Sequence, residues 1–261
     1  MKIFEKTYST PEENLACEEA ILLNLEERGR DEVMRIWYPA QTDAFPCFVV
    51  LGHANKVKSE VKVDACQKYG VPILRRCSGG GTVLNGHGCL NYSLYLRMDL
   101  HPELETIEST NQYVLGGIKV IFDAALQGMN NILFPNRKII STDFSTVKIQ
   151  GTSDLTWCNI KFSGNAQNRK KRYVLFHGTI LHSFDRAWMD KILKSPPKQP
   201  EYRKKRKHRD FVNNFPIPKT WFIENMKRVW NVEGTYKREP TQLIQELVET
   251  KYSQDSWNFK F

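Results

Sequence analysis

A glycine-rich segment in the first third of the chain contains the first residues whose types suggest chemistry. It reads Arg75-Arg76-Cys77-Ser78 and continues with three glycines and Thr82. Consecutive glycines let the backbone approach a ligand closely and direct several N–H groups at one anion, and an adjacent arginine adds a planar donor for phosphate or carboxylate. Alone, such a segment is more often a glycine-rich turn. Its spacing excludes a Walker loop and a Gly-x-Gly-x-x-Gly fingerprint.

A lysine motif in the second half of the chain is the next candidate. Lys161 stands in a predicted strand and precedes Ser163 and Gly164, and Asp154 stands a short strand and turn before it. A lysine in this place can neutralise negative charge on a substrate, and Asp154 can hold Mg²⁺ or a polar group of a nucleotide. Because an edge-strand lysine is commonly just exposed to solvent, the motif is weak evidence by itself.

The third candidate is a histidine inside a strand. His177 and Gly178 lie in the apolar run 173–182. A histidine in such a strand is more often a buried residue with a hydrogen-bond partner than a catalytic acid or base, so we keep both interpretations open.

The elements that must position these segments begin with a well-marked helix. Thr10 can cap it, Pro11 suits its first turn and Glu13 completes a capping box, so a helix is predicted up to Arg28, ending at Gly29. We expect further helices at 59–69 (closed by Gly70), 107–126, 219–229 and 241–252.

Short β-rich runs separate the helices. We expect strands at 33–38, 47–51, 71–75, 132–134, 138–140, 147–149, 155–162 and 173–182, and a hairpin joining 82–84 to 90–96 through 85–88. Helices at the start, middle and end with hairpins between them predict an α+β fold built on mixed or antiparallel sheets flanked by helices.

Taken together, the three segments resemble the catalytic domain of the lipoate–protein ligase family, within the biotin/lipoate ligase superfamily. Residues 75–83 resemble its Arg-Arg-x-Ser-Gly-Gly-Gly-Ala-Val loop, and 151–155 resemble its Asn-Asp-Leu stretch. Residues 161–167 resemble Lys-x-Ser-Gly-x-Ala-Gln/Tyr, and 177–181 match His-Gly-Thr-Leu-Leu. Weaker similarity at 14–20 and 251–259 extends the resemblance over nearly the whole chain.

The resemblance implies an ATP-dependent ligase that converts lipoate to lipoyl-AMP and transfers the lipoyl group to a lysine of a carrier domain. It implies that Lys161 is catalytic and contacts both the lipoyl carbonyl and the phosphate, and that Asp154 helps to bind Mg²⁺ through the nucleotide. It places an apolar tunnel for the acyl tail beside Val83, Leu84, Cys77 and Cys89. The implied ATP- and lipoate-binding residues are Arg76, Ser78, Gly79, Gly80, Gly81, Thr82, Val83, Leu84, Asn85, Asp154, Ser163, Gly164, His177 and Gly178.

The nearest alternative is an octanoyl- or lipoyl-transferase of the same fold that forms a cysteine thioester. Thr146 stands near the position of the nucleophilic cysteine in one transferase class. In the other class the cysteine lies beyond the His-Gly strand, and here no cysteine follows Cys158, which itself fits neither class well. Biotin ligase is disfavoured because its Gly-Arg-Gly-Arg loop is absent. Asn85-Gly86 and Cys89 depart from the family pattern and make the acyl-chain preference an open question.

The domain organisation is expected to be simple. Residues 1–194 form a catalytic core, and 195–261 form a proline-rich, basic linker and C-terminal helices that pack on the same domain. We expect no separate C-terminal accessory domain. Because many relatives continue into one, a separate accessory chain is a candidate partner.

Charge is concentrated in two short runs. The chain has 38 Lys and Arg and 29 Asp and Glu among its 261 residues, a net charge of +9. The runs at 169–172 and 203–209 contribute four and six positive charges, which leaves −1 elsewhere. Run 203–209 suits a solvated loop, a docking surface for an acidic lipoyl carrier (an E2 or glycine-cleavage H-like domain) or, least favoured, nucleic acid. Run 169–172 is expected near the active site.

The cysteines and the apolar stretches of the sequence limit the cellular compartment and the membrane association that we expect. The six cysteines are dispersed without a Cys-x-x-Cys pair, which is typical of reduced thiols and disfavours a structural metal site. The most apolar long stretch, 114–126, is interrupted by Lys119 and Asp123, and no signal peptide is recognisable. We therefore expect a cytoplasmic protein without a membrane partner.

Overall fold

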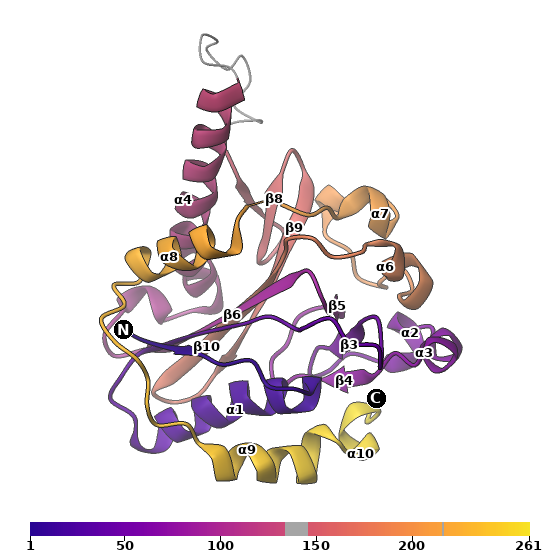
Figure 1. Cartoon of the computed structure of the whole chain (residues 1–261), viewed down its shortest axis with the longest axis horizontal. Coiled ribbons are helices and arrows are strands. Elements are labelled where there is room, and N and C mark those ends of the chain that lie inside the picture. The colour runs from indigo at the N-terminus through magenta and orange to yellow at the C-terminus, as the bar shows by residue number, and fades with distance from the viewer. Residues whose placement is uncertain (134–145, 216) are drawn as a thin grey trace.

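The computed structural model describes residues 1–133, 146–215 and 217–261 (Figure 1). Its main sheet has seven strands, in which only β1 and β2 pair in parallel. In spatial order they are β1 (Lys2–Glu5), β2 (Val33–Trp37), β6 (Cys89–Arg97), β10 (Tyr173–Leu181), β9 (Ile160–Arg169), β8 (Asp154–Trp157) and β7 (Lys148–Gln150).

A smaller sheet has three strands in the order β4 (Ile73–Arg75), β3 (Phe48–Leu51) and β5 (Val83–Asn85). Strand β3 pairs in parallel with β4 and antiparallel with β5. Two mixed sheets with flanking helices confirm the predicted α+β class.

Helices cover both faces of the main sheet because its strands alternate their side chains between the two faces. On one face, α1 (Pro11–Arg28) and α9 (Thr241–Leu247) pack with Tyr173 and Leu175 of β10. On the other, α4 (Ile107–Leu133) and α8 (Lys219–Val229) pack with Val174 and Phe176 (Figure 1). The predicted capping box is present, since Thr10 accepts from the Glu13 backbone N–H and Glu13 accepts from Thr10.

Short helices enclose the smaller sheet and complete the third apolar cluster. They are α2 (Val57–Glu60), α3 (Val63–Tyr69), α6 (Ala187–Ile192) and α7 (His208–Phe211). The other short elements are the 3₁₀ turns η1 (Pro102–Leu104) and η2 (Glu201–Arg203), the π-helical turn η3 (Val248–Tyr252) and α10 (Asp255–Asn258).

One predicted strand pairing and one predicted strand are wrong. The segments 82–84 and 90–96 do not form a hairpin, because β5 pairs with β3 whereas β6 pairs with β2 and β10. Gly88, with φ of +88°, packs against the backbone of Ser183 and turns the chain from one sheet to the other. The run 155–162 is two strands, since Cys158 and Asn159 adopt φ of +52° and +59° and form a two-residue turn.

Other boundaries also differ. The strand predicted at 132–134 is wrong at residues 132 and 133, which continue α4. Residue 134 and the strand predicted at 138–140 lie outside the described residues. The helix predicted at 59–69 is two helices, because Val61 leaves the helical path to bridge Leu193. In the described part of the chain, no helix is both long and apolar enough to cross a membrane.

Candidate active site

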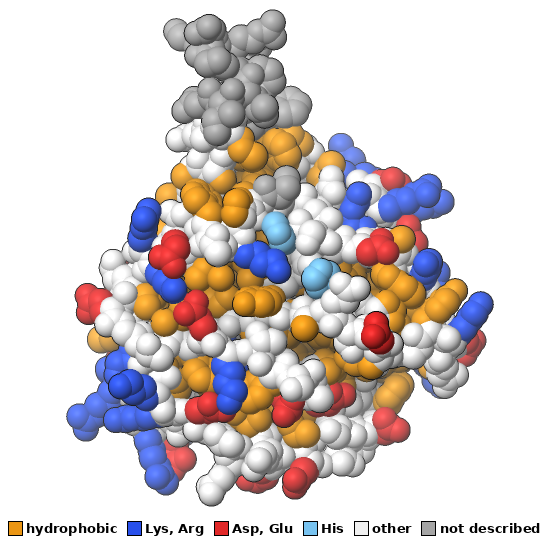
Figure 2. All heavy atoms as spheres, viewed as in Figure 1, with side chains coloured by type: hydrophobic (Ala, Val, Ile, Leu, Met, Phe, Trp, Pro, Cys, Tyr) orange, Lys and Arg blue, Asp and Glu red, His pale blue; other side chains and the backbone are white. Residues whose placement is uncertain are grey.

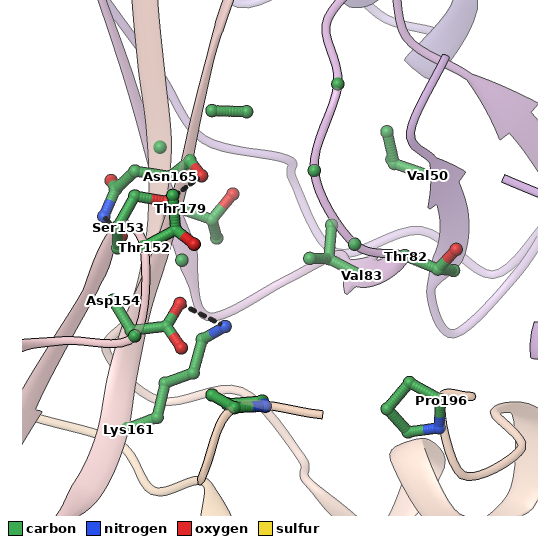
Figure 3. A pocket seen from close by; sticks show the side chains of 18 of the residues that line it. Val50, Thr82, Val83, Thr152, Ser153, Asp154, Lys161, Asn165, Thr179 and Pro196 are labelled. Atoms are coloured by element: carbon green, nitrogen blue, oxygen red, sulfur yellow. Dashed lines mark hydrogen bonds and ion pairs between the residues drawn. The ribbon is translucent and has the colours of Figure 1, made fainter. Parts of the chain in front are cut away.

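A cavity of about 1400 Å³ lies where the two sheets face each other. The glycine loop and β5 form one wall, and β8, β9 and β10 form the opposite wall (Figure 3). The segment 196–206, which includes the prolines of the predicted linker, borders the same cavity. Residues widely separated in sequence therefore meet around one space large enough for an extended acyl donor.

Lys161 and Asp154 form an ion pair on the wall made by the main sheet. Lys161 Nζ lies 2.7 Å from Asp154 Oδ1, and the two side chains are 24% and 14% exposed (Figure 3). Asp154 begins β8 and Lys161 lies in the adjacent strand β9, so the hairpin holds the two residues together. Lys161 is thus not a freely solvated edge lysine: it presents a fixed positive charge beside the cavity.

Two glycines leave the space that this wall requires. A Cβ at Gly164 would lie 3.0 Å from Lys161 Nζ, so glycine there lets the lysine fold back along its own strand. A Cβ at Gly178 would lie 1.7 Å from Oδ1 of Asn165. Asn165 is itself fixed, because its Nδ2 donates to the Ser153 carbonyl at 2.7 Å. Both glycines were predicted site residues, and each has a local packing reason.

The glycine loop is organised from inside by Arg76. Its guanidinium donates to the carbonyls of Val50, Gly79 and Gly81. Burial lowers the pKa of Arg76 to about 10. Gly80 has φ of +86°, and Gly79 to Gly81 are exposed at the cavity. Arg76 therefore shapes the loop in this structure, and the exposed glycine backbone is the part available to a ligand.

His177 connects the glycine loop to α1 beneath the cavity. Its Nε2 lies 2.6 Å from Ser78 Oγ, and its Nδ1 lies 2.8 Å from Glu18 Oε2. Glu18 also accepts hydrogen bonds from Ser93 Oγ and Trp37 Nε1. Burial alone would raise the pKa of Glu18, but His177, Arg35 and Ser93 outweigh it and lower the pKa to about 2. Glu18 is thus a buried carboxylate that stays ionised.

Most of the predicted binding residues line the cavity. They are Arg76, Gly79, Gly80, Gly81, Thr82, Val83, Asn85, Asp154, Lys161, Gly164, His177 and Gly178.

Three predicted binding residues, and two predicted tunnel cysteines, do not line the cavity among the described residues. Leu84 packs into the small-sheet core with Cys89, because strand alternation turns it away from its neighbours Val83 and Asn85. Ser78 is 1% exposed and holds His177 and Arg76 instead of facing a ligand. Ser163 is buried in β9, and Cys77 packs beside the α1 core.

Several cavity residues were not predicted from the sequence. Glu18 and Trp37 contribute from α1 and β2, and Asn91 and Thr179 form a hydrogen-bonded group with Asn85. Tyr202, from η2, donates its hydroxyl to Asp154 Oδ2 at 2.6 Å. The weak family similarity at 14–20 was the one indication in the sequence that Glu18 belongs to the site. Nothing in the sequence placed Tyr202 beside Asp154, because the two residues are 48 positions apart.

Asp154 as a Mg²⁺ ligand stays a prediction. Lys161 and Tyr202 already contact its two carboxylate oxygens. Among the described residues there is no group of three or more His, Cys, Asp or Glu that could hold a metal ion. The side chains alone therefore do not form a metal site, and Mg²⁺ at this place would depend mainly on phosphate oxygens of a nucleotide.

The basic run 203–209 divides into two kinds of residue. Arg203 is 4% exposed and lies over the Phe211 ring, and Arg206 donates to the carbonyls of Asn159 and Tyr202. The four exposed residues, which we call the basic rim, are Lys204, Lys205, Lys207 and Arg209. Figure 2 shows Lys and Arg side chains, with some acidic ones, gathered on the side where α7 lies. Lys204 lines the cavity, so the basic rim adjoins it at this residue.

In the other basic run, Arg169 comes close to the cavity, because it donates to Oε1 of Gln167, which lines the cavity, whereas residues 170–172 lie farther away. Residues 170–172 form the far end of the β9–β10 hairpin, about 26 Å along the strand from Lys161. Arg172 donates to the carbonyls of Glu26 and Gly29 at the end of α1. Arg169 donates to the carbonyls of Leu104 and Glu105. This run fastens the hairpin to neighbouring loops.

No cysteine is among the described residues that line the cavity. Cys77 and Cys158 are partly exposed, and the other four cysteines are buried. Burial raises the pKa of Cys77 and Cys89 to about 12, which keeps both thiols protonated near neutral pH. The residues 134–145 contain no cysteine in the sequence.

Comparison with known proteins identifies relatives over the whole length. The sequence is 28% identical over 280 aligned positions to the octanoyltransferase LipM of Bacillus subtilis, covering 97% of this chain and 95% of the relative. The fold resembles a lipoate–protein ligase A bound with ATP, with a TM-score of 0.70, 21% identity and coverage of 99% and 97%. It also resembles a bipartite lipoate–protein ligase studied with its E2 lipoyl domain from Thermoplasma acidophilum, with a TM-score of 0.68, 20% identity and coverage of 99% and 95%.

The family assignment rests on the sequence. The family model of the lipoyl protein ligase A/B catalytic domain matches residues 10–227, which contain the glycine loop, the Lys161–Asp154 pair and His177. The chain belongs to the lipoyl protein ligase A/B catalytic-domain family.

Proposed function

We propose that this protein transfers an octanoyl- or lipoyl-type acyl group from an activated donor directly to a lysine of a carrier domain. The observation that carries the proposal is the Lys161–Asp154 pair, which faces the exposed glycine loop across a cavity with no cysteine among its described lining residues. A fixed ammonium group and backbone N–H groups suit the stabilisation of developing negative charge. Such an arrangement supports amide formation without an enzyme thioester.

In the proposed reaction the carrier amine attacks the acyl carbonyl carbon. A C–N bond forms, the bond from the carbonyl carbon to the leaving group breaks, and the nitrogen releases a proton to solvent. Negative charge develops on the carbonyl oxygen and on the leaving group. Lys161 would neutralise this charge, and the loop from Gly79 to Gly81 would position the donor.

Two donors are compatible with this chemistry. The name of the Bacillus subtilis relative, an octanoyltransferase, favours transfer of an octanoyl group over the lipoate-plus-ATP reaction of a ligase, and an octanoyl thioester would be a donor for it. The cysteine usage disfavours a covalent acyl-enzyme thioester, because that route needs a nucleophilic thiol and none of the described cavity residues supplies one. We propose the adenylate as donor, because the Lys161 ammonium group suits the negative charge of its phosphate, and keep direct transfer from an octanoyl thioester as the second candidate. With an adenylating reaction, Mg²⁺ would enter bound to ATP phosphates beside Asp154.

The decisive experiment supplies each donor separately. The protein is incubated with an apo-lipoyl carrier and lipoate plus MgATP, preformed lipoyl-AMP, or an octanoyl-carrier thioester, and the carrier is weighed by mass spectrometry. Acylation from lipoyl-AMP that persists in Cys77→Ser and Cys158→Ser supports the proposal. Acylation from the octanoyl thioester alone supports the second candidate. No mass gain from any donor, or loss of activity in either serine variant, contradicts direct transfer.

The carrier is expected to dock on the basic rim. The rim adjoins the cavity and carries four exposed positive charges, so it fits an acidic carrier surface. Replacing Lys204 and Lys205 by glutamate is expected to raise the KM for the carrier about tenfold at low salt, with less effect at high salt. The matched control is Lys170→Glu with Lys171→Glu at the far end of the hairpin. Equal effects of the two double variants would argue against docking at the rim.

A further inference from the structure

A tyrosine from a distant part of the chain completes the arrangement around Lys161. Tyr202 donates its hydroxyl to Asp154 Oδ2 at 2.6 Å, while Asp154 Oδ1 lies 2.7 Å from Lys161 Nζ. One carboxylate thus joins the tyrosine and the lysine through its two oxygens. Because both oxygens of the carboxylate are engaged, the hydroxyl restricts the position from which Asp154 holds the ammonium group.

The segment that carries Tyr202 is itself fastened to the Lys161 hairpin. The Tyr202 ring packs on Phe211, with centroids 5.2 Å apart. Arg206 donates to the Asn159 carbonyl at 2.8 Å, which ties the segment to the β8–β9 turn. The Asn213 N–H donates to the Lys161 carbonyl at 2.9 Å. Side chain and backbone of Lys161 are therefore both held from the segment 202–213.

The backbone next to Tyr202 adopts an uncommon conformation. Lys204 and Lys205 have φ of +51° and +58°, a region that side chains other than glycine rarely occupy. On the other side, a Cβ at Gly151 would lie 3.4 Å from Tyr202 Cε1, so the ring already fits closely against the start of the β8 hairpin. This backbone path and the close fit together direct the hydroxyl at Asp154.

We propose that Tyr202 is a positioning residue that acts through Asp154 to fix the Lys161 ammonium group toward the cavity. The inference deepens the proposed acyl transfer and rests on it for its effect on rate. Tyr202 itself needs no contact with the substrate. Burial and the nearby Asp154 carboxylate raise the pKa of Tyr202, which keeps its hydroxyl protonated as a donor.

The test removes only the hydroxyl. Tyr202→Phe keeps the ring on Phe211 and is expected to lower kcat for acyl transfer about tenfold while changing the donor KM less than twofold. The control Tyr38→Phe, which removes a hydroxyl from an exposed tyrosine, is expected to leave both constants unchanged. If Tyr202 acts through Asp154, the variant Tyr202→Phe/Asp154→Asn will be no slower than Asp154→Asn alone. Multiplicative losses in the double variant would overturn the inference.

A second readout does not require activity. The NMR signal of the Lys161 side-chain ε-CH₂ group, assigned by its loss in Lys161→Ala, is expected to shift in Tyr202→Phe and to stay in place in Tyr38→Phe. An unchanged signal in Tyr202→Phe overturns the positioning role. If no donor gives acyl transfer but this signal shifts, the proposed function fails while the Tyr202–Asp154–Lys161 arrangement stands.

Discussion

Replacing Lys161 by alanine is expected to lower the rate of acyl transfer to the carrier by about 100- to 1000-fold, the usual effect of removing one group that stabilises transition-state charge. The structure gives two reasons for an effect of this size. Lys161 is held by Asp154 and by the backbone of residue 213, so its charge is positioned before the donor arrives. The end of its side chain lies against Gly164, where a Cβ would come within 3.0 Å of Nζ, so the glycine leaves the room that Lys161 needs to reach Asp154.

The measurement is single-turnover transfer from a preformed donor, which separates the chemical step from donor synthesis. Lys171→Ala, an exposed lysine at the far tip of the same hairpin, is the matched control and is expected to keep full activity. The unfolding temperature of both variants shows whether the fold is intact. A Lys161→Ala protein that is folded and transfers within threefold of the wild-type rate would show that Lys161 does not stabilise the transition state.

The chemistry-bearing segments were predictable because they are local. Gly79 to Gly81 are consecutive and can bring backbone close to a ligand without side chains in the way, and Lys161 with Gly164 lies within one strand. Their convergence could be anticipated only from the resemblance to a family. A motif match does not say which way a side chain points. Leu84 lies inside the matched loop, but strand alternation in β5 turns its side chain into the small-sheet core.

Long-range pairing explains most of what the sequence did not reveal. The pattern of 82–96 correctly indicated two strands, but strand patterns do not identify the partner, and β5 and β6 belong to different sheets. The turn at Cys158 and Asn159 lacks glycine, so little in the sequence indicated that the chain reverses direction there. Tyr202 and Glu18 reach the site from distant elements, and only the folded chain brings them beside Asp154 and His177.

The buried carboxylate of Glu18 is expected to make the protein lose stability in acid. Its pKa is about 2 in the folded protein and 4.5 ordinarily. Between these pH values the unfolded chain binds the proton more readily than the folded protein does. The contribution of ionised Glu18 to the free energy of unfolding is therefore full above pH 4.5 and is lost as the pH falls toward 2. A difference of this size corresponds to about 3 kcal/mol of unfolding free energy. Glu18→Gln has no charge to titrate, so this part of its pH dependence is expected to disappear.

Urea unfolding at a series of pH values between 2 and 6 measures this effect as the wild-type stability minus that of Glu18→Gln. The difference cancels the other carboxylates, and Glu27→Gln on the exposed side of the same helix provides the control, which should follow the wild-type curve. Parallel curves for wild type and Glu18→Gln would mean that Glu18 is not held ionised. Because Glu18 supports His177, and His177 holds Ser78 in the glycine loop, the variant is also expected to bind the acyl donor more weakly at neutral pH. Stability in acid and donor binding at neutral pH therefore depend on the same buried charge.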